Sequence, residues 1–437
     1  MKKTKIVFYS RKDVVARGDF ALYSRIGAEL AENENYTVYY VNNPDATIRA
    51  QYRFSNLIYT SITEKNKKDF EGAIFIFPIN TLFCLLEEIR DIKDAKLLCV
   101  LLHPNTLDWL ANQTVKRWFD MSKLVNLLKQ TNAYAVQDGD NLLKLEGKIG
   151  QSLEPRFFPV MMETPDSETI RLSLKNIEDK VANIAWLGRL DGDKIYSVIN
   201  FLDNLYEALG EKTAKFHIIG DGNAVTRINI SKYTPKIQIV FCSYLFGEKR
   251  DKYIMENADF VVAMGMSAIE TAPLKVPVVL PIVSPSPFRE DVFLYLYETK
   301  YFCPGWSLDG FAKASLKGRT CEIIINDIYA EKKKVEIGQK CYDYAIENFS
   351  VNKNAEKVLQ IIERTTLTVE QIRKEPIVKR QLTLFNLYRR FVNKNANWNR
   401  YLLFLDKFKL LMKRPKREIV KTVIKKLKEA LCAKKRK

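Results

Sequence analysis

The sequence predicts an α/β protein with two doubly wound, Rossmann-like domains, and three observations lead to this expectation. A chain of 437 residues is longer than one ordinary hydrophobic core requires. Short apolar runs rich in β-branched and aromatic residues alternate with helical patterns, which is typical of parallel βαβ units. A polar stretch at 162–180 interrupts the alternation, which then begins again.

Each half of the pattern contains five apolar runs that indicate buried strands. In the first half they lie at 5–10, 36–42, 73–78, 96–103 and 133–138, with helical patterns at 19–33 and around 116–130. In the second half they lie at 181–188, 215–220, 237–242, 258–265 and 276–281, with a helical pattern at 194–210. Because open α/β sheets bind ligands beyond the carboxyl ends of their strands, we expect the active site in the cleft between the two domains. The expected division of the chain is 1–160, 161–365 and a helical tail at 366–437.

The tail carries almost all of the net charge of +18. Residues 366–437 contain 22 Lys and Arg against 5 Asp and Glu, so the rest of the chain is nearly neutral. From Lys379 onward, leucine and aromatic residues recur three or four positions apart among the cations, which indicates a basic amphipathic helix. We therefore expect the tail to associate with an anionic membrane surface, and truncation after Glu363 to leave a soluble protein. A helix packed on the body is the alternative, and nucleic acid is not an expected partner because the apolar stripe suits lipid better.

Cysteine and histidine usage bears on the compartment and on metals. The seven cysteines are scattered without a C-x-x-C pair, and neither His103 nor His217 has a ligand partner at metal-binding spacing. We expect reduced thiols, no metal and no cofactor, and a cytoplasmic protein that is peripheral on the inner face of the cytoplasmic membrane. The chain has no G-x-S-x-G, Walker A or G-x-G-x-x-G motif, which argues against hydrolase, P-loop and simple dehydrogenase functions.

The stretch "GRLDGDK" at 188–194 follows a predicted strand and allows two chemical interpretations. Asp191 and Asp193 could hold a divalent cation, or Arg189 and Lys194 could bind a phosphate directly. A lysine at a helix start is unfavourable for the helix dipole unless an anion is bound there, and arginine can bind a diphosphate through two hydrogen bonds. Two carboxylates with no third one nearby make a weak cation site. A surface turn that binds no ligand stays an alternative.

A second candidate segment, "AMGMSAIETAPLKVPVV" at 263–279, runs from a strand end into a helix. Gly265 permits close approach of the backbone to a ligand, and Ser267 suits a helix N-cap or a phosphate contact. Glu270 lies one turn into the helix, where its carboxylate could accept hydrogen bonds from two ribose hydroxyls. A simple charge at the positive helix end explains Glu270 equally well.

Together with "IIGDG" at 218–222 and "ENFSVNKNAEKVLQIIE" at 347–363, these motifs resemble the retaining GT-B glycosyltransferases of the glycosyltransferase family 4 group. The resemblance covers 181–365 and is only architectural in the first 160 residues. It implies metal-independent transfer of a sugar from a nucleotide-sugar donor, as in hexosyltransferases of surface polysaccharide assembly. It further implies that Arg189 and Lys194 bind the donor diphosphate and that Glu270 holds the ribose. Further donor contacts are implied for the backbone or hydroxyl groups of Gly188, Gly220, Gly222, Gly265, Met266 and Ser267.

On the N-terminal side, the resemblance implies that His103, at the end of a strand, contacts the donor sugar, and that Gly18 and Asp19 lie near the acceptor. A strand-end histidine without a chemical role is the alternative. For Gly220 and Gly222, and for Asp138 to Asp140, a tight turn is the simpler explanation. The family usually has a second glutamate eight residues before the one that binds the ribose, and here that position is Val262. A non-catalytic nucleotide-sugar-binding or scaffold protein is therefore the rival function, and a GT-B epimerase is a nearer one. The expected acceptor is a glycan or a lipid-linked glycan.

Overall fold

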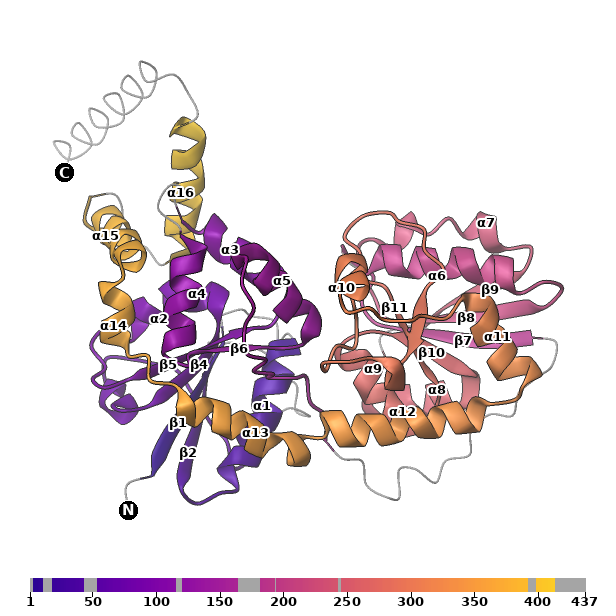
Figure 1. The fold of residues 1–437 in the computed structure, drawn as a ribbon, viewed down its shortest axis with the longest axis horizontal. Helices are drawn as coiled ribbons and strands as arrows, with labels where there is room; N and C mark the ends of the chain where they lie inside the picture. Colours follow the sequence, from indigo (N-terminus) through magenta and orange to yellow (C-terminus); the bar gives the residue numbers. More distant parts are fainter. Residues whose placement is uncertain are drawn as a thin grey trace.

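The computed structural model describes residues 3–10, 18–42, 53–114, 120–163, 181–192, 194–242, 245–391 and 398–412. Side chains are described for the same ranges except 18–19, 391, 398–399 and 408–412. The described residues form two α/β domains side by side, each built around a six-stranded sheet (Figure 1). The predicted fold class, two Rossmann-like domains, is confirmed.

The first domain contains a sheet in which every pair of strands is parallel, with the order β3-β2-β1-β4-β5-β6. Its strands are β1 (Thr4–Tyr9), β2 (Tyr36–Val41), β3 (Ile58–Thr60), β4 (Ile74–Pro78), β5 (Lys96–Leu101) and β6 (Tyr134–Val136). The helices α1 (Gly18–Ala31), α2 (Leu82–Glu88), α3 (Thr106–Asn112) and α4 (Met121–Gln130) lie between these strands in the sequence, and α5 (Gly139–Ile149) follows the last of them. Alternate residues of β1 enter two different cores, Ile6 and Phe8 on one face and Val7 and Tyr9 on the other.

The second domain has the strand order β12-β11-β10-β7-β8-β9, in which only β12 runs antiparallel to its neighbour. Its strands are β7 (Val181–Leu187), β8 (Thr213–Ile219), β9 (Ile237–Cys242), β10 (Phe260–Ala263), β11 (Val278–Pro281) and β12 (Phe293–Tyr295). Its helices are α6 (Ile195–Ala208), α7 (Ile230–Tyr233), α8 (Gly247–Asn257), α9 (Met266–Thr271), α10 (Leu308–Lys313), α11 (Cys321–Ile325) and α12 (Lys334–Phe349).

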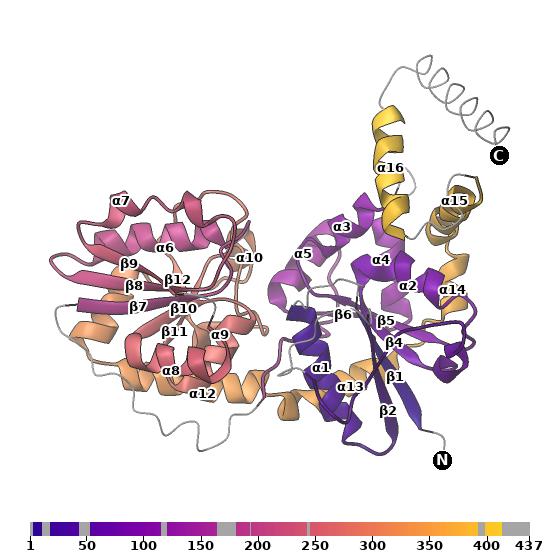
Figure 2. The ribbon, with the colours of Figure 1, turned by 180° about the vertical axis from the view of Figure 1, so that it is seen from behind.

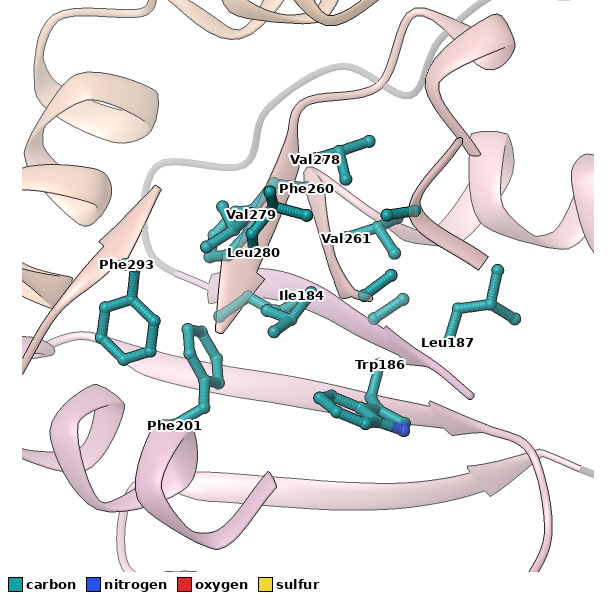
Figure 3. Packing of buried hydrophobic residues seen from close by; sticks show 14 of the residues in the cluster. Ile184, Trp186, Leu187, Phe201, Phe260, Val261, Val278, Val279, Leu280 and Phe293 are labelled. Carbon is teal, nitrogen blue, oxygen red and sulfur yellow. The ribbon is translucent and has the colours of Figure 1, made fainter. Parts of the chain in front are cut away.

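Buried side chains fill both faces of this second sheet. Phe201 of α6 packs edge-on against Phe293, with ring centroids 5.3 Å apart, beside Ile184 and Trp186 of β7 (Figure 3). The apolar residues of β7 occupy consecutive positions, because helices cover both faces of the sheet and leave neither to solvent.

The chain returns to the first domain after α12. Helix α13 (Val351–Arg364) packs against α1, and its residues Val351, Val358 and Ile362 share a core with Phe8. The outgoing and returning segments are hydrogen-bonded side by side, from Met162 N to Phe349 O and from Val351 N to Met162 O, each at 2.9 Å. The expected domain boundary at residue 365 is therefore corrected, because by its core contacts the second domain ends at Phe349. Two Rossmann-like domains agree with the GT-B fold that the sequence resemblance implies.

The expected tail is also corrected, because much of it is part of the first domain. Helices α14 (Val369–Lys374), α15 (Pro376–Phe391) and α16 (Trp398–Met412) follow α13, and Figure 2 shows α14 beside α2, α15 above α14, and α16 extending away from the domain. Residues that they and the preceding turn contribute lie buried in the core of the β1–β4–β5 sheet face, namely Leu367, Val369, Ile372, Ile377, Val378, Leu382, Phe385, Tyr388, Tyr401 and Leu405. Arg389 also pairs with Glu87 of α2 at 2.8 Å.

The packed-helix alternative thus describes the residues with described side chains at 366–390 and 400–407, where Phe385, Tyr388 and Tyr401 face protein and Phe404 is exposed. Residues 413–437, with 12 of the tail's cations, lie outside the described residues. Among the described helices, none combines the length and the apolar character needed to cross a bilayer.

Candidate functional site

The loops after β7, β8 and β10 form the centre of the candidate site. These strands are neighbours in the second sheet and parallel, so their carboxyl ends lie at the same edge. Each strand is followed by one of the predicted glycines, Gly188, Gly220 and Gly265. The topology therefore brings the sequence-predicted donor residues of three separate segments to one edge of one sheet.

Gly220 and Gly222 allow two of these loops to touch. A Cβ atom on Gly220 would lie 2.1 Å from Gly188 O, and one on Gly222 would lie 2.2 Å from Leu190 O. Leu190 N donates to Asp221 O at 2.9 Å, which fixes the loop after β7 on the loop after β8. Both glycines are therefore required by loop packing, whatever else they contact.

Arg189 and Lys194 bracket the loop that precedes α6. The Arg189 side chain is 61% exposed and pairs with Asp191 at 2.9 Å, across the turn. Lys194 N donates to Asp191 O at 2.8 Å, and Lys194 Nζ lies 3.8 Å from where a Cβ on Gly188 would be. Asp193 lies outside the described residues, so the predicted aspartate pair is not seen as a pair. Within the described ranges, no group of three His, Cys, Asp or Glu side chains is placed to hold a metal ion.

The third loop turns at Gly265, whose φ of 62° is a conformation that favours glycine. Gly265 itself is the residue that caps α9, so Ser267 is inside the helix and the expectation that it serves as N-cap is wrong. Gly265, Met266, Ser267 and Glu270 are all partly exposed, whereas a Cβ on Gly265 would meet only open space. Val262 is fully buried in β10, so no carboxylate reaches the site from that position.

Glu270 is held by two arginines that the sequence did not single out. Arg25 Nη2 of α1 lies 2.8 Å from Oε1, and Arg250 Nη1 of α8 lies 2.8 Å from Oε2. Burial favours the neutral acid, but the two guanidinium groups outweigh it and hold the pKa of Glu270 below its ordinary value. Glu270 is therefore ionised and already paired. No local pattern in the sequence signals this contact, because Arg25 lies 245 positions away in a helix of the other domain.

A second contact between the domains involves the Asp138–Gly139–Asp140 segment. Asp138 caps α5 by accepting from Asn141 N at 2.9 Å, and Gly139 and Asp140 begin that helix, so the segment is a helix start and the predicted tight turn is corrected. Asp140 Oδ1 accepts from Ser307 Oγ of the second domain at 2.6 Å. A Cβ on Gly139 would lie 2.7 Å from atoms of Trp306 and Tyr301, so only glycine fits there. Burial raises the pKa of Asp138 to about 7.

His103 follows the end of β5, as expected, and its described contacts are local. Its Nδ1 accepts from Asn105 N at 3.1 Å, and its ring stacks on Trp109 with centroids 4.8 Å apart. Thr106 Oγ1 accepts from His103 N at 3.0 Å, so the histidine belongs to the turn that begins α3. Gly18 and Asp19 begin α1, and their side chains lie outside the described ranges, so their proximity to an acceptor stays a prediction.

No protein-family model and no curated protein sequence matches this chain. Among solved structures, the chain is similar to TarM of S. aureus, with 17% identity and a TM-score of 0.41 over 68% of this chain and 56% of that one. It is also similar to a sucrose-phosphate synthase of Thermosynechococcus elongatus, with 12% identity and a TM-score of 0.49 over 83% and 99% of the two chains. A third similar structure is an alpha-glucosyltransferase in complex with UDP, with 10% identity and a TM-score of 0.46 over 83% and 100%. The match thus spans little more than half of TarM, and the fold assignment depends on the strand order and the returning helix described above.

Proposed function

We propose that the protein is a metal-independent glycosyltransferase that moves a sugar from a nucleotide-sugar donor to a glycan or lipid-linked acceptor, with retention at the anomeric carbon. The observation that carries this proposal is the meeting of the loops after β10, β7 and β8 at one sheet edge. That edge presents the cations Arg189 and Lys194, the turn at Gly265 and the ionised carboxylate of Glu270. These groups complement a diphosphate and a ribose.

In the proposed mechanism, the second domain holds the donor and stabilises the leaving group. Negative charge grows on the nucleoside diphosphate as the bond to the sugar breaks. The Arg189 guanidinium and the Lys194 ammonium stabilise that charge, which lowers the barrier without a metal ion. Asp191 orients Arg189 through their ion pair. In the same proposal, His103 contacts the donor sugar, and Gly18 and Asp19 border the acceptor.

The C-terminal residues serve, in this proposal, to bring the enzyme to an anionic membrane face on the cytoplasmic side. The described part of the extension leaves the apolar residues Leu387 and Leu403 exposed at 45% and 65%. Beyond Met412 the sequence is strongly basic, and each cation near an anionic surface contributes about 1 kcal/mol. The full chain should sediment with vesicles of phosphatidylglycerol and be partly released by salt, whereas the chain ending at Met412 should bind them weakly. Equal sedimentation of both would refute this part of the proposal.

A donor screen tests the enzymatic proposal directly. Purified protein is incubated with UDP-, GDP- and ADP-sugars, with and without membrane extract, and nucleotide release is measured. We expect release from one donor class that depends on the extract and persists in chelator. Activity that is lost in chelator and restored by Mg²⁺ would return Asp191 and Asp193 to the role of metal ligands.

The buried Val262 favours one rival, a non-catalytic nucleotide-sugar-binding protein. Such a protein would show donor binding in calorimetry but would release no nucleotide in the presence of any membrane extract. Transfer of label from the donor to an acceptor excludes it.

A further inference from the structure

The ion pair between Arg25 and Glu270 joins the two domains at the carboxylate proposed for the donor ribose. Arg25 Nη2 lies 2.8 Å from Glu270 Oε1, while Arg25 Nη1 donates to Met161 O at 3.0 Å. The Arg25 side chain is 9% exposed and that of Glu270 is 15% exposed. Arg25 of helix α1 therefore occupies one of the two carboxylate oxygens, and a ribose hydroxyl that took its place would have to break this contact.

The two arginines on Glu270 differ in the domain to which they belong. Arg250 lies on α8 in the same domain as Glu270, so its ion pair is kept when the domains move relative to each other. Arg25 lies on α1 of the first domain, so its ion pair depends on the domain arrangement. Of these two arginine contacts, the one made by Arg25 can couple the state of the donor site to the position of the other domain.

Arg25 also has another carboxylate within reach. Glu163 Oε1 lies 3.4 Å from Arg25 Nε, and the Glu163 side chain is 57% exposed. An open groove of about 400 Å³ borders Arg25, and its lining includes Glu29, Glu32 and Glu163. If Arg25 leaves Glu270, its guanidinium can therefore stay paired with Glu163 and move into the groove. This avoids the large cost of a buried unpaired charge.

We propose that Arg25 is a positioning residue for donor binding: it holds Glu270 and the two domains together when no nucleotide is bound, and the ribose hydroxyls of the donor displace it. This inference depends on the proposed role of Glu270 as the ribose carboxylate. Because the ion pair and the ribose contact compete for the same carboxylate oxygen, weakening the ion pair strengthens ribose binding, at most by the factor by which the ion pair is weakened.

Calorimetry with UDP and GDP, each compared with its 2′,3′-dideoxy form, tests this proposal. Arg25→Met removes the charge but keeps an apolar chain of similar length. It should tighten binding of the preferred ribonucleotide by roughly tenfold, within the range of ordinary coupling between sites, and leave the dideoxy form unaffected. Arg25→Lys should bind like the wild type. Arg250→Met is the matched control, because it removes the other guanidinium from the same carboxylate without touching the domain contact, and it should not tighten binding.

Small-angle scattering gives a second readout that needs no nucleotide. Ligand-free Arg25→Met should have a larger radius of gyration than the wild type. Unchanged affinity and size in Arg25→Met, with normal binding by the wild type, would overturn the inference and leave the proposed function intact. Equal tightening by both arginine variants would also overturn it. Absence of binding by wild type and variant alike would overturn the proposed function and the displacement with it.

Discussion

The second domain builds its core from one continuous stretch of chain, whereas the first domain takes part of its core from the opposite end of the sequence. The buried residues of the second domain all lie between 160 and 349. Those of the first domain come from the first 161 residues and again from 351 to 405. The described part of the basic extension, as far as α16, therefore has a structural role in the first domain.

Truncation after Glu363 should have the largest effect and should damage only the first domain. It removes the buried side chains of Leu367, Ile372, Phe385 and Tyr401, among others. Each contributes about 1.5–3 kcal/mol by burial, so their sum matches or exceeds the whole stability of a typical domain, about 5–15 kcal/mol. We expect an insoluble or partly unfolded protein, in contrast to the soluble one expected from composition.

The control for this truncation is the chain ending at Met412, which keeps α14, α15 and α16. Its thermal unfolding should match that of the full chain. Limited proteolysis of the chain ending at Glu363 should leave a resistant fragment from the second domain, about residues 181–349. Cooperative folding of the protein that ends at Glu363 would show that the extension contributes little to the stability of the first domain.

Tyr401→Ala tests the structural role of the extension with a single side chain. Tyr401 is 1% exposed and packs on Phe385 and Tyr388, with its hydroxyl within 3.1 Å of Gln381 Nε2. Removing a buried aromatic ring costs about 3–5 kcal/mol, so unfolding of the first domain in urea should shift to clearly lower concentration. Phe404→Ala, three residues further along the helix and 36% exposed, is the matched control and should cost much less. Equal losses of stability in the two variants would show that the buried face of α16 is not the one that contains Tyr401.

Arg189→Ala and Lys194→Ala should act on function without affecting either core. Each variant should lose about 10²–10³-fold in kcat, the usual result of removing one group that stabilises transition-state charge. Circular dichroism and melting should stay unchanged, because the Arg189 side chain is 61% exposed. Arg289→Ala, another exposed arginine of the second domain, is the control. Activity near that of the wild type in both variants would remove the diphosphate assignment.

The success of the predictions from sequence depends on whether the contacts involved are local or distant along the chain. Alternating strands and helices are local patterns, so each apolar run predicted as a strand overlaps one in the structure. Contacts such as Arg25 to Glu270, or Phe385 to the sheet, join distant segments and leave no local pattern. The tail shows why: an apolar stripe at helical spacing looks the same whether lipid or protein covers it. Two strands of the structure, β3 and β12, were not predicted from the sequence, and each is only three residues long.

Replacing Asp138 by asparagine should have an effect that depends on pH and is small near pH 4, and it concerns the place where the first domain meets the second. Burial raises the pKa of this carboxyl from 3.8 to about 7, so the folded state holds its proton over a range in which the unfolded state has lost it. Stability contributed by this group is therefore present below pH 3.8 and declines as pH rises from there to about 7, with a limiting slope of about 1.4 kcal/mol per pH unit. Asparagine keeps an oxygen that can cap α5 but cannot ionise, so Asp138→Asn should flatten the decline and stabilise the protein at pH 8.

Urea midpoints between pH 4 and pH 8 measure this change in stability. Asp120→Asn is the control, since Asp120 caps α4 in the same way but is exposed. A midpoint that fell with pH equally in wild type and Asp138→Asn would show that another group governs the dependence.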